Sequence, residues 1–440
     1  MAGLLPRGGS PRATDPNHVT RAALRNRQTY RADYGGRTPP LSPSIALLLS
    51  IAGILVLLRL KLAPGIAVFA GCLILSFLIL PPLRTPELIL ETVTSVGTIR
   101  LVAIVICSLT LSKLMEMKGL LLSLSRTLES VGPKTALHVV PAIIGLVPMP
   151  GGALISATAV KGLATRLGLS PAQATYVNFW FRHLWEPSIP VYPAVVAASA
   201  ILAVPLGTVV TTMLPSIPLI AACGAIVSWQ ILKGKTCERA PRLTFRTFSN
   251  QLVRAAWPVI LLVGLVIGGL EAAFAFVLVL ILLCVQQRVT KSEIQTSLRY
   301  AFGPRIILLL FAVMLYKGIV DASGAAYALF DDLTALGVPP ALMLVILPML
   351  IGFATGLSIA FVGISFPLLL PFMGNGGGLS AAALFLAYMS GMAGYNASPL
   401  HLCLVLTVEY FQSRIGDVYR LILPPLAAVV GISLLVYFLV

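Results

Sequence analysis

The feature that most constrains this chain is a series of apolar segments, many of which reach the roughly 20 residues that a helix needs to cross a bilayer. In lipid, only helices and closed barrels satisfy every backbone hydrogen bond, and barrel strands need only about 10 residues. The long continuous segments therefore predict an all-α protein that crosses the cell (inner) membrane many times. The composition agrees, because only 10% of the residues are charged and 58% are hydrophobic.

Two of the apolar segments are too long for a single crossing and carry helix-breaking residues near their centres. Residues 135–165 contain the sequence PMPGG at 148–152, and residues 340–372 contain GFATG at 352–356. Proline lacks a backbone N–H and glycine is a poor helix former, so each cluster predicts a turn. A turn in the middle of the membrane would fold each segment into a re-entrant helical hairpin.

Each of these long segments is followed by an apolar segment with an interrupted centre. Residues 172–201 contain EPSIP at 186–190, and residues 380–410 contain NASP at 396–399. Both interruptions predict helices that are broken inside the membrane. A plain apolar segment follows in each case, so the same order occurs twice along the chain.

The two halves also match in register, which predicts an internal repeat. Gly145 recurs as Gly352, 207 residues later, and Tyr176 recurs as Tyr388, 212 residues later. Five full crossings and one hairpin in each half give about 10 transmembrane helices, and an odd number of crossings inverts the second repeat, as in secondary transporters. The predicted organisation is a disordered basic tail (1–43), inverted repeat 1 (44–232), a basic cytoplasmic linker (233–254) and inverted repeat 2 (255–440).

The formal net charge of +16 does not indicate nucleic-acid binding, because the charges lie in short segments between the apolar ones. Cytoplasmic loops of membrane proteins carry an excess of Lys and Arg. An outside N-terminus puts most of the 31 basic residues on the cytoplasmic side, with the basic tail as the exception. Amphipathic stretches at 116–132 and 321–337 precede the hairpins and are predicted to lie along the interface.

Ionisable residues within membrane segments are costly, and they are therefore candidates for function. Asn178, Arg182 and Glu186 are spaced four residues apart, which predicts one stripe of a helix facing a hydrated cavity. The alternative is an Arg182–Glu186 pair that only stabilises the helix. His183 and Glu186 are the predicted proton-coupling residues, because both can exchange a proton near physiological pH when buried.

The predicted hairpin tips offer backbone groups as well as side chains. Free N–H groups at a half-helix N-terminus suit an anion, whereas free carbonyls at an opposing helix end suit Na⁺. Simple kinks in packed helices are the alternative. The sequence has no CxxC, HExxH or nucleotide-binding loop, so no metal or cofactor is predicted. The predicted substrate-binding residues are Pro150, Gly151, Gly152, Ser156, Asn178, Arg182, Ser188, Thr355, Gly356, Ser358, Asn396, Ser398 and His401.

Three stretches resemble a known family: VPMPGGA at 147–153, NFWFRHLWE at 178–186 and SPLHLCL at 398–404. The family is the group of bacterial and archaeal membrane proteins called domain of unknown function 401, and the resemblance extends over residues 44–440. It implies a branch of the ion transporter superfamily, alongside gluconate permeases and divalent-anion/sodium symporters. Inverted repeats, a dimer that works as an elevator, and anionic substrates coupled to H⁺ or Na⁺ are also implied. Sodium-coupled relatives carry Ser-Asn-Thr at both hairpin tips, which this sequence lacks, so their dicarboxylate site does not transfer.

The sequence therefore predicts a secondary active transporter, and not an enzyme, that moves a small organic anion by an elevator mechanism. Proton-coupled symport is the predicted mode, with Na⁺ as the alternative coupling ion. The predicted partners are the anionic solute, the lipid bilayer and a second copy in a homodimer, without nucleic acid. A passive channel of the same fold, a membrane-embedded enzyme and a subunit of a larger complex are the rival hypotheses.

Overall fold

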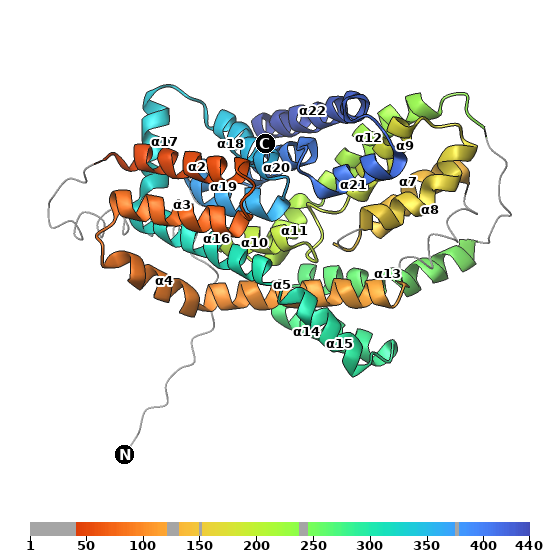
Figure 1. The fold of residues 1–440 in the computed structure, drawn as a ribbon, viewed down its shortest axis with the longest axis horizontal. Coiled ribbons are helices and arrows are strands. Elements are labelled where there is room, and N and C mark those ends of the chain that lie inside the picture. The colour runs from red at the N-terminus through yellow and green to blue at the C-terminus, as the bar shows by residue number, and fades with distance from the viewer. Residues whose placement is uncertain (1–40, 121–131, 149–151, 237–244, 375–377) are drawn as a thin grey trace, which may run out of the picture.

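The computed structural model describes residues 41–120, 132–148, 152–236, 245–374 and 378–440 (Figure 1). The regular structure in these ranges is helical, apart from an isolated bridge between Gly374 and Leu379. The helices of the first half are α2 (Pro43–Arg59), α3 (Pro64–Ile79), α4 (Arg84–Thr94), α5 (Val96–Met117), α7 (Pro133–Ile144), α8 (Gly152–Arg166), α9 (Pro171–Arg182), α10 (Pro193–Leu202), α11 (Leu206–Met213) and α12 (Ser216–Leu232). The helices of the second half are α13 (Phe245–Ile267), α14 (Ala272–Gln286), α15 (Lys291–Ala301), α16 (Pro304–Ser323), α17 (Ala325–Ala335), α18 (Pro340–Thr355), α19 (Ser358–Met373), α20 (Ala381–Ala397), α21 (Leu402–Phe411) and α22 (Ile415–Leu439).

The helix order of the first half recurs in the second half. Two helices, a short helix and a longer helix come first, as α2 to α5 and as α13 to α16. A helix pair follows, α7–α8 or α18–α19, and then a helix interrupted by a break, α9–α10 or α20–α21. Helices α11 and α12 then correspond to α22. The inversion of the two halves across a membrane stays a prediction.

Four helices within the described residues are long and apolar enough to cross a membrane: Val96–Met117, Leu206–Leu232, Pro304–Ser323 and Ile415–Leu439. Other apolar helices, including both arms of the second hairpin, α18 and α19, are shorter. Short apolar helices that pair with one another are expected where the chain turns back at membrane depth. The all-α membrane class is therefore confirmed, whereas the predicted number of crossings stays a prediction.

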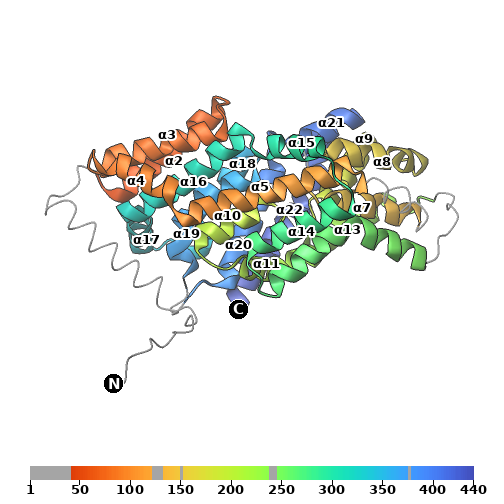
Figure 2. The ribbon, with the colours of Figure 1, turned by 90° about the horizontal axis from the view of Figure 1, so that it is seen from below.

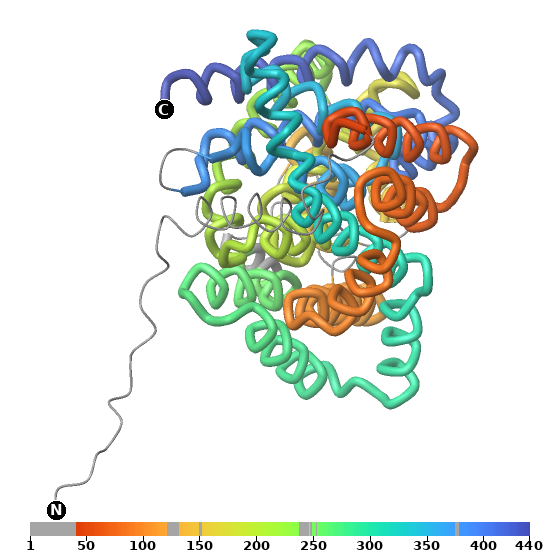
Figure 3. Tube along the Cα trace, turned by 90° about the vertical axis from the view of Figure 1, so that its left-hand side faces the viewer, coloured from red at the N-terminus to blue at the C-terminus, as the bar shows by residue number. Residues whose placement is uncertain are grey.

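Helices from the two halves pack against each other in matched pairs. Helix α3 packs on α16, and its counterpart α14 packs on α5; likewise α10 packs on α19 and α21 packs on α8. Figure 2 shows α5 running across one face next to α14, and Figure 3 shows α2 and α3 side by side in the end view. The two halves are thus in extensive contact, and their breaks come close together.

The helices at the centre are buried around their whole circumference. Every residue at 174–182 in α9, 360–369 in α19 and 382–396 in α20 is buried. Glycine allows α18 and α20 to touch through their backbones, because a Cβ added to Gly352 would lie 2.5 Å from the carbonyl oxygen of Gly391. Polar side chains on α9 and α20 are therefore enclosed by protein.

Capping residues set where these two central helices begin. The side chain of Ser170 accepts the N–H of Gln173, whose side chain accepts the N–H of Ser170 in return, and Pro171 is the first helical residue of α9. At the start of α20, Ser380 accepts the N–H of Ala383. These contacts satisfy N–H groups that have no partner within the helix. The starting points determine which residues of α9 and α20 reach the two breaks.

Predictions of individual helices differ from the structure in part. The plain apolar segment that follows residues 172–201, predicted at 205–232, corresponds to the membrane-length stretch Leu206–Leu232, in which a turn at Pro215 separates α11 from α12. Helix α13 begins at Phe245, so the end of the predicted linker 233–254 is helical. The amphipathic helices α4 and α15, at matching places in the two halves, were not predicted. Their polar faces break the apolar pattern that identified the other segments.

The structure describes only part of the two amphipathic stretches that precede the hairpins, and only one of the two hairpin turns in full. Helix α17 lies within the amphipathic stretch predicted at 321–337, whereas the stretch at 116–132 falls largely outside the described residues. The turn between α18 and α19 contains Gly356, whose φ of +65° suits glycine. The turn between α7 and α8 includes residues 149–151, which lie outside the described residues.

Candidate functional site

The first helix break begins at Arg182, the last residue of α9, and regular helix resumes at Pro193. Pro187 explains the ending, because in a continued helix its ring would clash with the carbonyl of His183. The predicted stripe of Asn178, Arg182 and Glu186 is therefore wrong for Glu186, which lies in the irregular segment and not on the helix. The prediction assumed that residues 178–186 form one continuous helix, which Pro187 does not allow.

Side chains of this first break hold the end of α7. Trp185 Nε1 donates to the carbonyl oxygen of Ala142 at 2.7 Å, and the Tyr192 hydroxyl donates to that of Gly145. The guanidinium of Arg182 donates to the carbonyl oxygen of Ile144 at 3.5 Å. The first hairpin and the first break are thus fastened together by side chain to backbone bonds.

The second break separates α20 from α21 and is short. Helix α20 ends at Ala397, and Pro399 accounts for the ending in the same way as Pro187 does in the first half. The Ser398 hydroxyl accepts the N–H of Leu400 at 3.2 Å, which closes a tight turn. His401 then occupies the position before the first residue of α21, without a capping hydrogen bond from its side chain, and is buried.

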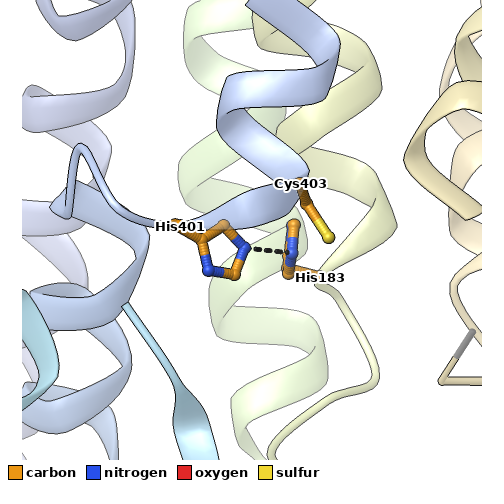
Figure 4. Close-up of side chains that lie close together, drawn as sticks. All are labelled: His183, His401 and Cys403. Atoms are coloured by element: carbon orange, nitrogen blue, oxygen red, sulfur yellow. Dashed lines mark hydrogen bonds between the residues drawn. The ribbon is translucent and has the colours of Figure 1, made fainter. Parts of the chain in front are cut away.

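The two breaks meet at a pair of histidines (Figure 4). His183 Nε2 and His401 Nε2 lie 3.0 Å apart, although the residues are 218 positions apart in the sequence. His183 Nδ1 contacts the carbonyl oxygen of Phe179 at 2.6 Å, and His401 Nδ1 contacts that of Gly356 at 2.9 Å. The pair therefore connects α9, α21 and the turn of the second hairpin.

Cys403 lies beside the histidine pair, on the first turn of α21. Its Sγ and one nitrogen of each ring all lie within 4.8 Å of one another. Imidazole and thiolate are ligands that zinc and copper prefer, so His183, His401 and Cys403 are the described residues that could hold a metal ion. The sequence pattern did not reveal this cluster, because its members come from both halves of the chain.

Two charged side chains complete the polar centre. Glu186 is buried, and its Oε2 lies 4.0 Å from His183 Nε2. The carboxyl group is also close enough to interact electrostatically with Tyr192, Tyr388 and Tyr395. Arg182 is buried and interacts electrostatically with Tyr192 and with the thiol of Cys403. Buried ionisable groups at this density are costly, and they commonly mark functional sites in membrane proteins.

Several predicted substrate-binding residues instead satisfy nearby backbone groups. Ser156 donates to the carbonyl oxygen of Ala153 and Thr355 to that of Ile351, each within its own helix. Ser188 is buried and donates to the carbonyl oxygen of Met213 at 2.7 Å, which ties the first break to α11. These contacts favour structural roles for the three hydroxyls.

The remaining predicted residues are placed as follows. Asn178 lies on α9 and bonds to the carbonyl oxygen of Ala153 and to the hydroxyl of Thr407. Gly152 begins α8 and is buried, whereas Ser358 begins α19 and is half-buried. Pro150 and Gly151 lie outside the described residues.

Some buried polar atoms near the breaks have no hydrogen-bond partner within the described part of the chain. They are Asn178 Oδ1, Asn396 Oδ1, the Tyr388 hydroxyl and the Ser390 hydroxyl. Buried polar groups in native proteins are nearly always paired, so such a group of exceptions is typical of a place where solute or water binds. All four lie on α9 or α20, the helices that lead into the two breaks.

A cavity of about 560 Å³ lies beside α7, α9 and α12, and neither Arg182, His183 nor Glu186 lines it. Lys134, His138, Lys233 and Ser228 are among its lining residues, together with Phe181, the neighbour of Arg182 in sequence. The His138 ring contacts the Ser228 hydroxyl at 2.8 Å and the Phe181 ring at 4.5 Å between centroids. Two lysines lie among lining residues that are otherwise mostly apolar, and the volume lies within the size range of small-molecule sites.

Comparison with known proteins gives two similarities. The profile of a family described as "Protein of unknown function (DUF401)" matches residues 41–440. The fold is similar to that in "Crystal structure of the Alcanivorax borkumensis YdaH transporter reveals an unusual topology", with a TM-score of 0.58 and 15% sequence identity. That similarity covers 80% of this chain and 86% of the other chain. No curated protein matches the chain in sequence.

Proposed function

This chain belongs to the DUF401 family, and we propose that it is a secondary active transporter that moves a small organic anion across the cell membrane together with a proton. The observation that carries the proposal is the buried group of Arg182, His183 and Glu186 at the first helix break, in contact with His401 at the second. A fold shared with a protein described as a transporter supports the same role.

The charge of Arg182 and the two lysines that line the cavity support an anionic substrate. Arg182 offers a planar pair of donors that matches a carboxylate. The cavity is lined by Lys134 and Lys233 together with Phe181, the residue before Arg182 in the sequence. Its volume of about 560 Å³ suits a solute of a few carbon atoms and excludes a macromolecule. The unpartnered polar atoms on α9 and α20 would bind the uncharged parts of the solute.

The mechanism that we propose is an elevator of the ion transporter superfamily type. The two hairpins and the two broken helices form the mobile unit, and the remaining helices form a frame that dimerises with a second copy. Helices α18, α19 and α20 pack on one another, helices α7, α8 and α9 do the same, and α21 packs on α8 and α9, which supports movement of the hairpins together with the broken helices. His183 and Glu186 supply the proton-binding groups, so that proton and solute bind cooperatively.

The test is uptake by purified protein in liposomes under imposed H⁺ or Na⁺ gradients, across a panel of small carboxylates. We expect one or more of these solutes to accumulate when the outside is acidic. Movement of solute down its own gradient without accumulation would identify a passive channel and contradict the proposal. Failure of every carboxylate, with a cationic or neutral solute transported instead, would contradict the anionic assignment.

The Glu186→Gln variant tests the coupling role with the transported solute. Glutamine resembles the protonated acid, so the variant should still exchange labelled for unlabelled solute across the liposome membrane. It should lose accumulation driven by the proton gradient, because it no longer releases a proton. Accumulation by Glu186→Gln on a proton gradient alone would show that Glu186 is not a coupling group.

A further inference from the structure

Each histidine at the two breaks has its ring orientation fixed by a backbone carbonyl. A carbonyl oxygen can only accept a hydrogen bond, so a ring nitrogen that contacts one carries a hydrogen. His183 Nδ1 contacts the carbonyl oxygen of Phe179 at 2.6 Å, and His401 Nδ1 contacts that of Gly356 at 2.9 Å. In a neutral ring, Nε2 then presents a lone pair. Histidines that bind metal ions almost always have their other nitrogen held in this way.

The free sides of the two rings converge on a thiol. His183 Nε2 and His401 Nε2 lie 3.0 Å apart, and the Cys403 thiol contacts both rings. The sulfur and one nitrogen of each ring lie within 4.8 Å of one another. Zinc binds nitrogen at about 2.0–2.1 Å and sulfur at about 2.3 Å, so the ligand atoms of a tetrahedral zinc ion lie roughly 3.3–3.6 Å apart. Small shifts of the side chains therefore suffice to bring all three onto one ion.

We propose that His183, His401 and Cys403 bind one zinc ion, which joins the helix break of the first half to that of the second half. Cys403 lies in the first turn of α21, where the positive end of the helix favours a thiolate ligand. The carboxylate of Glu186, 4.0 Å from His183 Nε2, and the thiolate together balance the two positive charges of zinc. Imidazole and carboxylate groups beside a thiolate suit zinc better than Cu(I), which prefers sulfur ligands.

The zinc ion would also offer a binding position for the solute. Three protein ligands leave one position of a tetrahedral ion open, as in catalytic zinc sites. Arg182 interacts electrostatically with the Cys403 thiol, so its positive charge lies near the ion. A solute carboxylate fills the open position and is attracted by Arg182 at the same time. This step rests on the proposed function, and it makes Glu186 the group that carries the coupled proton, because His183 is a ligand.

Zinc loading of the purified protein tests the metal site and needs no solute. The protein is freed of its affinity tag and of metal, incubated with zinc, desalted and analysed. We expect one zinc ion per chain, and X-ray absorption at the zinc edge should show one sulfur at about 2.3 Å beside nitrogen ligands at about 2.0–2.1 Å. Substoichiometric zinc, or zinc without a sulfur ligand, would overturn the site and leave a hydrogen-bonded group of two histidines and a thiol.

Cobalt(II) in place of zinc identifies the cysteine, because a thiolate bound to cobalt gives an intense charge-transfer band in the ultraviolet. A variant with Cys403 as its sole cysteine should keep this band, whereas Cys403→Ser should lose it. Cys223→Ser is the matched control, because Cys223 is a buried thiol outside the cluster. A band that persists in Cys403→Ser would assign the metal to another cysteine and overturn the proposal.

The contribution of the second half is tested with His401→Gln. Loss of a ligand should lower the zinc affinity by more than the roughly 10–100-fold that loss of a group supporting a ligand costs. His138→Gln is the control, because His138 contacts Ser228 and lies outside the cluster. Unchanged zinc affinity in His401→Gln would remove the second half from the site. The zinc content and X-ray absorption of the wild type decide the question even where a variant fails to fold.

The open position is tested with a carboxylate that the uptake panel shows to be transported. Its addition to the cobalt protein should change the visible spectrum, and removal of metal should lower uptake by about tenfold or more until zinc is restored. An unchanged spectrum, or full uptake by metal-free protein, would overturn the contact between solute and metal. If no carboxylate is transported, the proposed function fails, while the zinc measurements still decide whether the metal site exists.

Discussion

Arg182 is the only described arginine that is buried at the polar centre, and its surroundings determine how it can act on a solute. Gly145 packs directly on its backbone, because an added Cβ would lie 2.0 Å from the Arg182 carbonyl oxygen. The contact with Ile144 leaves the guanidinium at the edge of the first hairpin. An arginine held at this junction can bind a carboxylate and sense the position of the hairpin at the same time.

Replacing Arg182 with lysine should weaken solute binding while keeping the charge. Lysine cannot form the planar bidentate contact, and a lost charge-assisted hydrogen bond corresponds to roughly a tenfold higher KM. The measurement is the concentration dependence of uptake in liposomes, with the exposed Arg299→Lys on α15 as the matched control. An unchanged KM in Arg182→Lys would show that the guanidinium does not contact the solute.

Individual site residues could be predicted from the sequence only where a charged side chain lies in an apolar segment, because such a placement is energetically unfavourable. Arg182, His183 and Glu186 were found because charged groups in apolar segments are unfavourable unless they serve a purpose. Their mutual geometry could not be predicted, since Pro187 ends the helix that the spacing assumed. The contact between His183 and His401 could not be predicted, because no sequence pattern in a single chain relates residues 218 positions apart.

At the scale of helices, glycines set the distance between the hairpins and the broken helices. A Cβ on Gly352 of α18 would lie 2.5 Å from the carbonyl oxygen of Gly391 and 2.9 Å from the backbone N of Tyr395 in α20. Backbone atoms cannot move aside as the end of a flexible side chain can. Helices α18 and α20 therefore depend on glycine for their close contact.

Gly352→Ala should separate α18 from α20 and lower stability by about 1–3 kcal/mol. Gly162→Ala is the matched control, because a Cβ at that position meets no atom within 4 Å and alanine is the better helix former. Thermal unfolding of both variants in detergent gives the comparison. Equal midpoints would mean that the two helices can move apart without cost.

The short helix α15 is joined to α5 by an ion pair outside the apolar segments. Lys118 Nζ lies 2.8 Å from Glu293, and this hydrogen bond, together with the N–H of Thr290, lowers the pKa of Glu293 to about 2. An ordinary glutamate has a pKa of about 4.3. A lowered folded-state pKa stabilises the protein fully above the unfolded-state value, and the contribution disappears as the pH falls toward 2.

Lys118→Met should therefore lower the unfolding midpoint at neutral pH, and its difference from the wild type should shrink as the pH falls from about 5 to about 3. Lys134→Met is the control, because Lys134 bonds to the carbonyl oxygen of Leu232, which does not titrate. Its difference from the wild type should not change over this range. A constant difference for Lys118→Met would exclude Glu293 as its partner.

Elements were predictable where their composition was uniform. The long apolar segments and the interruptions at the two breaks correspond to α7–α10 and α18–α21 within a few residues. Helices α4 and α15 were missed because polar residues on one face interrupt the apolar pattern, so a test of helical periodicity could have found them. Helix α13 began earlier than predicted, because its first turns carry basic residues.

At the scale of the whole molecule, matching contacts support an internal repeat. The offsets of 207 and 212 residues relate Gly145 to Gly352 and Arg182 to Gly394. A Cβ on Gly145 would lie 2.8 Å from the carbonyl carbon of Arg182, and one on Gly352 would lie 3.4 Å from that of Gly394. The backbone contact is thus repeated while the arginine is not. The site is consequently asymmetric, with the guanidinium contributed by the first half alone.

The orientation of the whole molecule gives the last prediction. With the N-terminus outside, the basic segment after α12 is cytoplasmic and the end of α17 is external. In a background without the native cysteines, Thr236→Cys should resist an impermeant thiol reagent in intact cells, whereas Leu336→Cys should react. Thr236 and Leu336 are both exposed, so a difference in labelling reports the side of the membrane and not burial. Equal labelling after the cells are permeabilised is the control for intrinsic reactivity. Because cytoplasmic loops collect Lys and Arg, the opposite result in intact cells would reverse the topology and place the basic tail at residues 1–43 inside.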